Sequence, residues 1–298
     1  MTPHCSGPQA APCRRAAALT LKRRSRCTAI CPLCSSSFLL YRKLKRTIMQ
    51  NMIELQNVTK RYGSFRAVDA VSLAVPRGEL FGFLGVNGAG KTTTLRMLAG
   101  VLLPTAGRIR LGDYDLGTEP EKAKAITGYI PDRPYLYAKL TGREFLHFCA
   151  DLYNVPHPRA NERIDQLLAE FNLSEWQNSL IDSYSHGMKQ RLATCSALVH
   201  EPQILIIDEP IVGLDPHGAK LLKESLRRYT ANGMTIFLST HSLHVAEEVC
   251  DRLAIIHRGA LLTVGTLAEI RQRSGSEHER LESVFIQITS ETSDTQGA

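Results

Sequence analysis

Residues 80–99 constrain the fold more than any other segment of this chain of 298 residues. A continuous apolar run, Leu80–Leu84, leads directly into the glycine-rich segment 85–92, and a helical pattern follows over 92–99. A short, continuous apolar run is typical of a strand that is buried on both faces. Strand, loop and helix in this order form the context in which G-x4-G-K-[ST] acts as a phosphate-binding loop. The segment therefore predicts an α/β domain that binds a nucleotide.

The residue types of the loop suit a nucleoside triphosphate. Its glycines let backbone N–H groups converge on phosphate oxygens, and the helix that begins near Lys91 adds the positive end of its dipole. Lys91 contributes a positive charge, and the Thr92 hydroxyl can ligate Mg²⁺. The residues expected to contact the nucleotide here are Gly85, Asn87, Gly88, Gly90, Lys91, Thr92 and Thr93.

A second apolar run, residues 204–207, ends in Asp208 and Glu209. Acidic residues at the carboxyl end of a buried strand lie at the ligand crevice of an open α/β sheet. Asp208 is expected in the Mg²⁺ shell, and Glu209 is placed to polarise an attacking water as a general base. A pair of solvated acids at a strand end is the alternative, and the nearby phosphate loop argues against it.

The remaining pattern indicates how the domain is organised. Residues 53–58 and 68–75 alternate between apolar and polar side chains, which predicts two half-buried antiparallel strands. Residues from about 140 to 185 have helical spacing without strand signals, so we expect an inserted helical subdomain. Short β-rich runs at 235–238 and 253–256 continue a mostly parallel sheet. The predicted fold class is an α/β P-loop NTPase with an N-terminal antiparallel β subdomain.

The segment Tyr184-Ser185-His186-Gly187-Met188 resembles the L-S-G-G-Q signature of ATP-binding cassette (ABC) transporter subunits. It departs from the signature at Tyr184, His186 and Met188, and it keeps the serine and the glycine. The chain as a whole resembles the ATP-binding subunit of these transporters over about residues 53–290. The resemblance implies ATP and Mg²⁺ as cofactors and two ATP molecules held between two subunits.

The resemblance also implies further site residues. Ser185 and Gly187 would contact the γ-phosphate that the other subunit binds, and Asp215 would lie in the loop through which the subunits sense each other. Tyr62 corresponds to the aromatic residue that stacks on adenine, although a tyrosine near a strand turn can also serve packing alone. His241, after the strand at 235–238, would contact the γ-phosphate and orient Glu209, the two forming a catalytic dyad.

Asp132 is the main departure from the family pattern, because a glutamine normally occupies this position. Aspartate is shorter and anionic and lacks the N–H donor, so it can ligate Mg²⁺ without reproducing every contact of glutamine. The following segment, residues 133–144, resembles the ABC-2 subgroup that works with drug and polysaccharide exporters. We therefore expect export rather than import.

Residues 1–51 differ from the rest of the chain in charge and cysteine content. They hold ten of the 36 basic residues and five of the eight cysteines, and no Asp or Glu. We interpret them as a disordered extension or a start-site artefact, with a transit peptide and a zinc site around Cys27, Cys31 and Cys34 as alternatives. The expected domains are this extension, the ABC ATPase domain at 52–290 with its helical subdomain at about 133–185, and a tail at 291–298.

The charge distribution bears on the choice of partner. Outside the extension, 26 basic residues face 29 acidic ones, which gives no reason to expect nucleic-acid binding by the body of the chain. The resemblance implies a second ABC ATPase subunit and transmembrane permease subunits as partners. The expected function is ATP hydrolysis that powers transport, at the cytoplasmic face of the cell membrane. The alternative is a soluble ABC-type ATPase that acts on nucleic acid or the ribosome.

Overall fold

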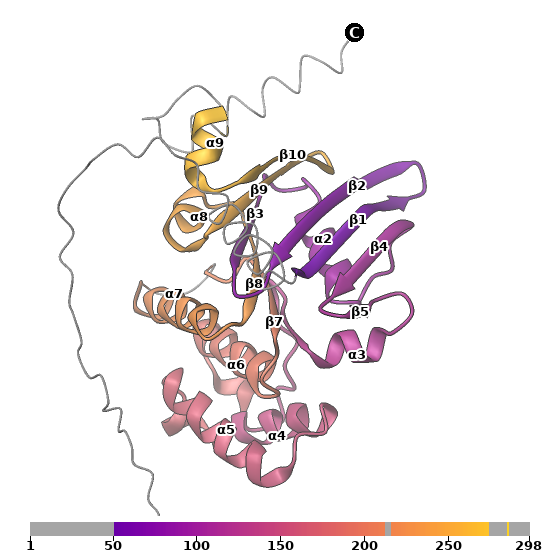
Figure 1. The fold of residues 1–298 in the computed structure, drawn as a ribbon. Coiled ribbons are helices and arrows are strands. Elements are labelled where there is room, and N and C mark those ends of the chain that lie inside the picture. Colours follow the sequence, from indigo (N-terminus) through magenta and orange to yellow (C-terminus); the bar gives the residue numbers. More distant parts are fainter. Residues whose placement is uncertain (1–50, 212–215, 274–284, 286–298) are drawn as a thin grey trace, which may run out of the picture. The chain divides into compact units, whose positions relative to one another are not determined.

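Two β-sheets organise the part of the chain that the structure describes, which comprises residues 51–211, 216–273 and Phe285 (Figure 1). The structure is a computed structural model. All of these residues belong to one structural unit that spans residues 47–298. Residues 1–50 of the expected extension, the expected tail at 291–298 and Asp215 lie outside the described residues, whereas Asn51, the last residue of that extension, begins the first strand.

The first sheet has four strands in the order β2-β1-β4-β5, all antiparallel to their neighbours. Its strands are β1 (Asn51–Tyr62), β2 (Phe65–Pro76), β4 (Ala106–Leu111) and β5 (Tyr114–Asp115). Only two residues separate β1 from β2, and the register places Tyr62 opposite Phe65. The predicted hairpin is therefore confirmed, whereas β4 and β5 were not predicted.

The second sheet has six strands in the order β10-β9-β3-β8-β7-β6. Its strands are β3 (Leu80–Leu84), β6 (Thr127–Ile130), β7 (Ile204–Asp208), β8 (Thr235–Thr240), β9 (Arg252–His257) and β10 (Ala260–Gly265). The pairs from β9 to β6 are parallel, and β10 pairs antiparallel with β9. The expected mostly parallel core sheet is confirmed.

The central strands are buried on both faces, as their continuous apolar runs predict. Ile206 and Phe237 belong to the hydrophobic cluster shared with the first sheet, whereas Ile207 and Leu238 belong to the cluster shared with the helices. Side chains alternate between the faces of a strand, so neighbours along one strand join different cores. Helix α2 (Lys91–Leu98) contributes Leu95 to the first of these clusters, and it lies between the two sheets in Figure 1.

Helices fill the segment for which the sequence predicts no strands. The helices after α2 are α3 (Pro120–Ala125), α4 (Gly142–Leu152), α5 (His157–Glu170), η1 (Ser174–Trp176), η2 (Ile181–Ser183), α6 (His186–Leu198), α7 (Pro216–Ala231), α8 (Leu243–Val249) and α9 (Leu267–Arg273). Helix α4 begins with a capping box, in which Thr141 and Glu144 satisfy each other's backbone N–H groups. Among the described residues, none of these helices has the length and apolarity needed to cross a bilayer.

The strand order determines where the loops of interest meet. The loops after β3, β7 and β8 start from adjacent parallel strands, so they emerge at the same edge of the sheet. The first carries the phosphate loop, the second begins at Glu209, and the third contains His241. Segments that are more than 100 residues apart in sequence are thereby brought together.

Candidate nucleotide-binding site

One cavity of about 490 Å³ lies at this edge of the core sheet and extends to the tip of the β1–β2 hairpin. Its lining residues are Tyr62, Phe65, Ala67, Asn87, Gly88, Gly90, Lys91, Thr92, Thr93, Asp132, Glu209 and His241. Most of the residues that the sequence singles out therefore share one cavity. Phe65 and Ala67 also line the cavity but were not predicted from the sequence.

The loop between β3 and α2 requires glycine at particular positions. Gly88 and Gly90 adopt φ values of 81° and 106°, which L side chains rarely tolerate. A Cβ at Gly90 would also lie only 2.5 Å from the Ala67 carbonyl oxygen, and one at Gly85 would lie 2.5 Å from the Ile256 carbonyl oxygen. The loop is therefore packed directly against backbone on two sides, which fixes where its N–H groups point.

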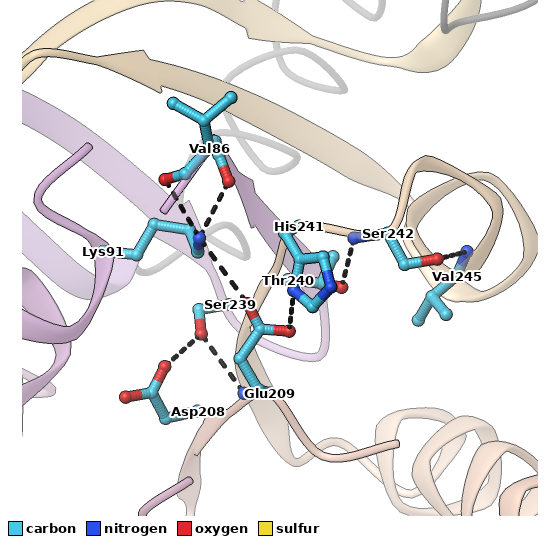
Figure 2. A network of polar contacts seen from close by, with 10 residues as sticks. Val86, Lys91, Asp208, Glu209, Ser239, Thr240, His241, Ser242 and Val245 are labelled. Carbon is cyan, nitrogen blue, oxygen red and sulfur yellow. Dashed lines mark hydrogen bonds and ion pairs between the residues drawn. The ribbon is translucent and has the colours of Figure 1, made fainter. Parts of the chain in front are cut away.

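Lys91, Glu209 and His241 form a continuous chain of polar contacts (Figure 2). Lys91 Nζ donates to the Gly85 carbonyl at 2.8 Å and to the Val86 carbonyl at 3.3 Å, and it lies 3.5 Å from Glu209 Oε1. The other oxygen of Glu209, Oε2, lies 2.9 Å from His241 Nδ1. Lys91 and Glu209 are largely buried, whereas His241 is half exposed. The chain therefore runs from the base of the cavity to solvent.

Asp208 lies behind Glu209 and is 1% exposed. Its Oδ1 accepts a hydrogen bond of 2.5 Å from the Ser239 hydroxyl, while Oδ2 has no hydrogen-bond partner among the described residues. A buried carboxylate oxygen without a donor is unfavourable unless a cation or water satisfies it. Asp208 therefore fits the role of a ligand to a cation, directly or through water.

The available oxygens fit Mg²⁺ in particular. The Thr92 side chain at the start of α2 and the Asp132 carboxylate both line the cavity, and like Asp208 they offer the hard oxygen donors that Mg²⁺ prefers. Across the described residues, no group of three or more His, Cys, Asp or Glu side chains forms a complete metal site.

Two exposed aromatic side chains stand at the opposite end of the cavity. Tyr62 and Phe65 face each other across the β1–β2 hairpin and are 50% and 64% exposed. Lys60 Nζ lies 5.4 Å from the centre of the Tyr62 ring, on the strand that carries Tyr62. Large aromatic surfaces that line a cavity and remain open to solvent are suited to stacking on a nucleobase.

Among the described residues, Gly85, Asp208, Ser185 and Gly187 were also expected at the site but do not line this cavity. Ser185 caps helix α6, with its hydroxyl accepting a hydrogen bond from the Met188 backbone N–H at 3.3 Å. Ser185 is exposed, and Gly187 lies in the first turn of the same helix. Asp215 lies outside the described residues. The structure therefore neither brings Ser185 and Gly187 to the phosphate loop of their own chain nor tests Asp215.

A second cavity, of about 330 Å³, lies between the end of α2, strand β6 and helix α4. Val101 and Leu152 line it and are 68% and 65% exposed. Tyr153, also in its wall, stacks on His200 with ring centres 3.6 Å apart, and burial lowers the pKa of His200 to about 4. Tyr129 reaches this cavity too, and burial raises the pKa of its hydroxyl, with Asp208 acting in the same direction.

Sequence reasoning missed Phe65 and Ser239. The first could have been found, because a turn at Gly63 and Ser64 places Phe65 directly opposite Tyr62. Ser239 gives no comparable signal. It is a single serine at the end of an apolar strand, and its contacts depend on the register between β7 and β8.

Comparison with known proteins gives consistent matches to this region of the chain. The family model described as "ABC transporter" matches residues 68–212. The linearmycin resistance ATP-binding protein LnrL of Bacillus subtilis is 36% identical over 226 residues, which are 76% of this chain and 73% of that protein. The probable multidrug ABC transporter ATP-binding protein YbhF of Escherichia coli is 36% identical over 242 residues, which are 80% of this chain and 42% of that protein.

A solved structure supports the same assignment at the level of the fold. A solved structure of an ATP-binding subunit of an ABC transporter superposes with a TM-score of 0.76 at 35% sequence identity. The match covers 80% of this chain and 99% of that chain. The fold of this domain therefore has a counterpart in a solved protein.

Proposed function

We propose that this chain, which belongs to the ABC transporter family, is the ATP-binding and ATP-hydrolysing subunit that powers export through a separate membrane permease. Members of this family bind and hydrolyse ATP. The observation that carries the proposal is the single cavity in which Lys91, Thr92, Glu209 and His241 meet beneath the aromatic pair of the hairpin. A nucleotide placed there has its phosphates at the loop and its base at Tyr62.

The phosphate end of the cavity supplies positive charge and backbone donors. The N–H groups of the loop and of the first turn of α2 are oriented by the glycine conformations at Gly88 and Gly90. Lys91 Nζ can exchange its contacts with loop carbonyls for contacts with the β- and γ-phosphates. Thr92, Asp208 and Asp132 are the residues that would hold Mg²⁺, which when bound neutralises charge on the phosphates.

Glu209 is the proposed general base. A water molecule next to its carboxylate attacks the γ-phosphorus, the bond from that phosphorus to the bridging oxygen of ADP breaks, and the proton of the water passes to Glu209. His241 Nδ1, 2.9 Å from Oε2, holds the carboxylate in one orientation. His241 is therefore a positioning partner in the dyad, and it does not need to transfer a proton.

A second subunit completes the site in this proposal. ABC ATPase subunits of transporters generally dimerise and pair with a membrane permease. Ser185 and Gly187, at the exposed start of α6, would reach the γ-phosphate that a second copy or a related subunit binds, and Asp215 would lie at the contact between the subunits. Domain boundaries are part of the proposal: 52–290 forms the ATPase domain with its helical subdomain at about 133–185, and 1–51 and 291–298 are extensions.

The second cavity is the proposed contact surface for the permease. Its exposed apolar side chains, Val101 and Leu152, provide the kind of surface that a short amphipathic helix of a partner buries. Tyr135 and Tyr137, which are 97% and 58% exposed in the segment between β6 and α4, offer further apolar area. Binding there would place the chain at the cytoplasmic face of the membrane. Export as the direction is supported by the names of the relatives LnrL and YbhF.

Two substitutions test the chemistry. Glu209→Gln should retain ATP binding and accumulate an ATP-bound dimer while turnover falls about 10²- to 10⁴-fold, as expected for loss of a general base. Lys91→Ala should weaken nucleotide binding itself. Hydrolysis at the normal rate by the first variant, or unchanged ATP affinity in the second, would contradict these assignments.

A pull-down from membranes tests the partner. Glu209→Gln protein in mild detergent, with and without residues 1–51, should co-purify with a multi-helix permease in both cases. Recovery of ribosomal or nucleic-acid-bound proteins instead would favour the alternative of a soluble ABC-type ATPase. Loss of ATP hydrolysis on removal of residues 1–51 would show that the extension belongs to the enzyme.

A further inference from the structure

Ser239 is a buried polar residue that belongs neither to the phosphate loop nor to the catalytic dyad. It is fully buried at the carboxyl end of β8, and the register pairs it with Asp208 on β7. The alternation along the two strands places Ser239 on the same face as Phe237, and Asp208 on the same face as Ile206. That is the face covered by α2, the helix that starts at the phosphate loop.

The Ser239 hydroxyl holds the Asp208 carboxylate in one orientation. It donates to Oδ1 at 2.5 Å, at the short end of the range for O–H···O hydrogen bonds. Oδ1 accepts this hydrogen bond, whereas Oδ2 has no hydrogen-bond partner among the described residues, so Oδ2 is the oxygen most in need of a cation or water. With the serine hydroxyl removed, a carboxylate that is 1% exposed would lose this donor and the restraint on its rotation.

Ser239 also holds the backbone of Glu209. The Glu209 N–H donates to the Ser239 carbonyl at 3.2 Å and approaches the Ser239 hydroxyl oxygen at 3.3 Å. Glu209 has a φ of 50°, in the left-handed region that a residue other than glycine adopts only at a cost. The surrounding contacts must therefore stabilise this conformation, and both oxygens of Ser239 take part. Figure 2 shows the contacts of the hydroxyl oxygen with Asp208 and with the Glu209 nitrogen.

We propose that Ser239 is a positioning residue that aligns the cation ligand Asp208 with the general base Glu209 through one hydroxyl group. The hydroxyl donates to the first residue and accepts from the second, so neither can turn without disturbing the other. This role rests on the proposed function, because it gives both carboxylates a part in ATP hydrolysis. It adds a residue that contacts neither the nucleotide nor the cation. Ser239 acts only through the orientations of Asp208 and Glu209.

The matched pair Ser239→Thr and Ser239→Val tests the hydroxyl separately from packing. Threonine and valine have nearly the same shape, and both suit a strand, so any strain from the added methyl groups affects both variants alike. Ser239→Ala, which adds no volume, serves as a second variant that lacks the hydroxyl. Thr235→Val is the control, because Thr235 is buried in the same strand and pairs with Ile204 at the far end of β7.

The measurement is binding of a fluorescent ATP analogue as Mg²⁺ is titrated, beside binding in EDTA. We expect all variants to bind the analogue equally in EDTA, because the phosphate loop is unchanged. In Ser239→Val and Ser239→Ala, the Mg²⁺ concentration for half-maximal tightening should rise about 10- to 100-fold, the usual effect of losing a residue that supports a metal ligand. Ser239→Thr and Thr235→Val should stay close to wild type.

ATP turnover gives the second readout. At saturating Mg²⁺ the variants without the hydroxyl should have a lower kcat and an unchanged KM for ATP, with Ser239→Thr rescuing kcat. Equal Mg²⁺ titrations for Ser239→Thr and Ser239→Val would overturn the role of Ser239 and leave the proposed function intact. A wild-type chain that neither binds the analogue more tightly with Mg²⁺ nor hydrolyses ATP would overturn the proposed function.

Discussion

Gly88 and Gly90 offer a direct test of how the phosphate loop is held. Both have positive φ, at 81° and 106°, so alanine at either position places a side chain in an unfavourable backbone region. Their surroundings differ. A Cβ at Gly88 would have no neighbour within 4 Å, whereas a Cβ at Gly90 would lie 2.5 Å from the Ala67 carbonyl oxygen. Comparing Gly88→Ala with Gly90→Ala therefore separates the cost of backbone strain from the cost of a steric clash with β2.

The expected magnitudes follow from these two terms. Forcing alanine into a left-handed conformation costs about 1–2 kcal/mol, and this is the whole expected effect of Gly88→Ala. Gly90→Ala adds the cost of moving backbone in a packed core, about 1–3 kcal/mol, for a total of about 2–5 kcal/mol. In a domain of this size, each kcal/mol lowers Tm by about 2–4 °C.

Urea unfolding without nucleotide, followed by far-UV circular dichroism, measures the difference. Gly90→Ala should have a clearly lower midpoint than Gly88→Ala, with the same dependence on denaturant. ATP binding, measured in parallel, should fall more for Gly90→Ala, because a displaced Ala67 also changes the wall of the cavity. Equal midpoints for the two variants would refute the inference that β2 fixes the loop by direct contact at Gly90.

Two further predictions concern the aromatic pair and the second cavity. Phe65→Ala should weaken ATP binding by roughly fivefold to a hundredfold, because a stacked base contributes about 1–3 kcal/mol. The affinity for inorganic tripolyphosphate, which has no base, should stay unchanged. Equal losses of affinity for both ligands would contradict base stacking. Burial lowers the pKa of His200 to about 4, so the unfolded chain takes up a proton near pH 6.5 that the folded chain resists. The free energy of unfolding should therefore fall by up to about 3 kcal/mol between pH 6.5 and 4, as measured by urea titrations at each pH. His200→Phe, which can still stack on Tyr153, should reduce this dependence on pH. An unchanged dependence would exclude His200 as its source.

Much of the fold was predictable because the signals that define it are local. The run Leu80–Leu84 is apolar at every position, and all five residues are buried. Strand β4 was missed for the opposite reason. Only Ile109 and Leu111 are buried in Ala106–Leu111, so the strand has little apolar pattern and is held by pairing with β1. Such pairing joins residues about 50 apart in sequence, which periodicity does not detect.

Strand β10 was not predicted, although the sequence before it contains a turn signal. Arg258 and Gly259 both have positive φ, at 46° and 81°, and they connect β9 to β10 as a two-residue turn. Positive φ at both central residues is the geometry that joins antiparallel strands tightly. A glycine after a short β-rich run therefore indicated a hairpin, which makes the last strand of the core sheet antiparallel.

In the candidate site, too, some features are indicated by local sequence and others depend on residues that are distant in the chain. Lys91, Asp208 and His241 each come after an apolar run, so the sequence indicates them one at a time. What the sequence does not contain is the strand order, in which β8 lies between β3 and β7 although it comes last of the three in the chain. This order puts His241 and Ser239 between the phosphate loop and the acidic residues, where the first contacts Glu209 and the second contacts both Asp208 and Glu209. Candidate residues that follow an apolar run could therefore be picked out from the sequence, whereas the role proposed for Ser239 depends on the register of β7 and β8 and required the structure.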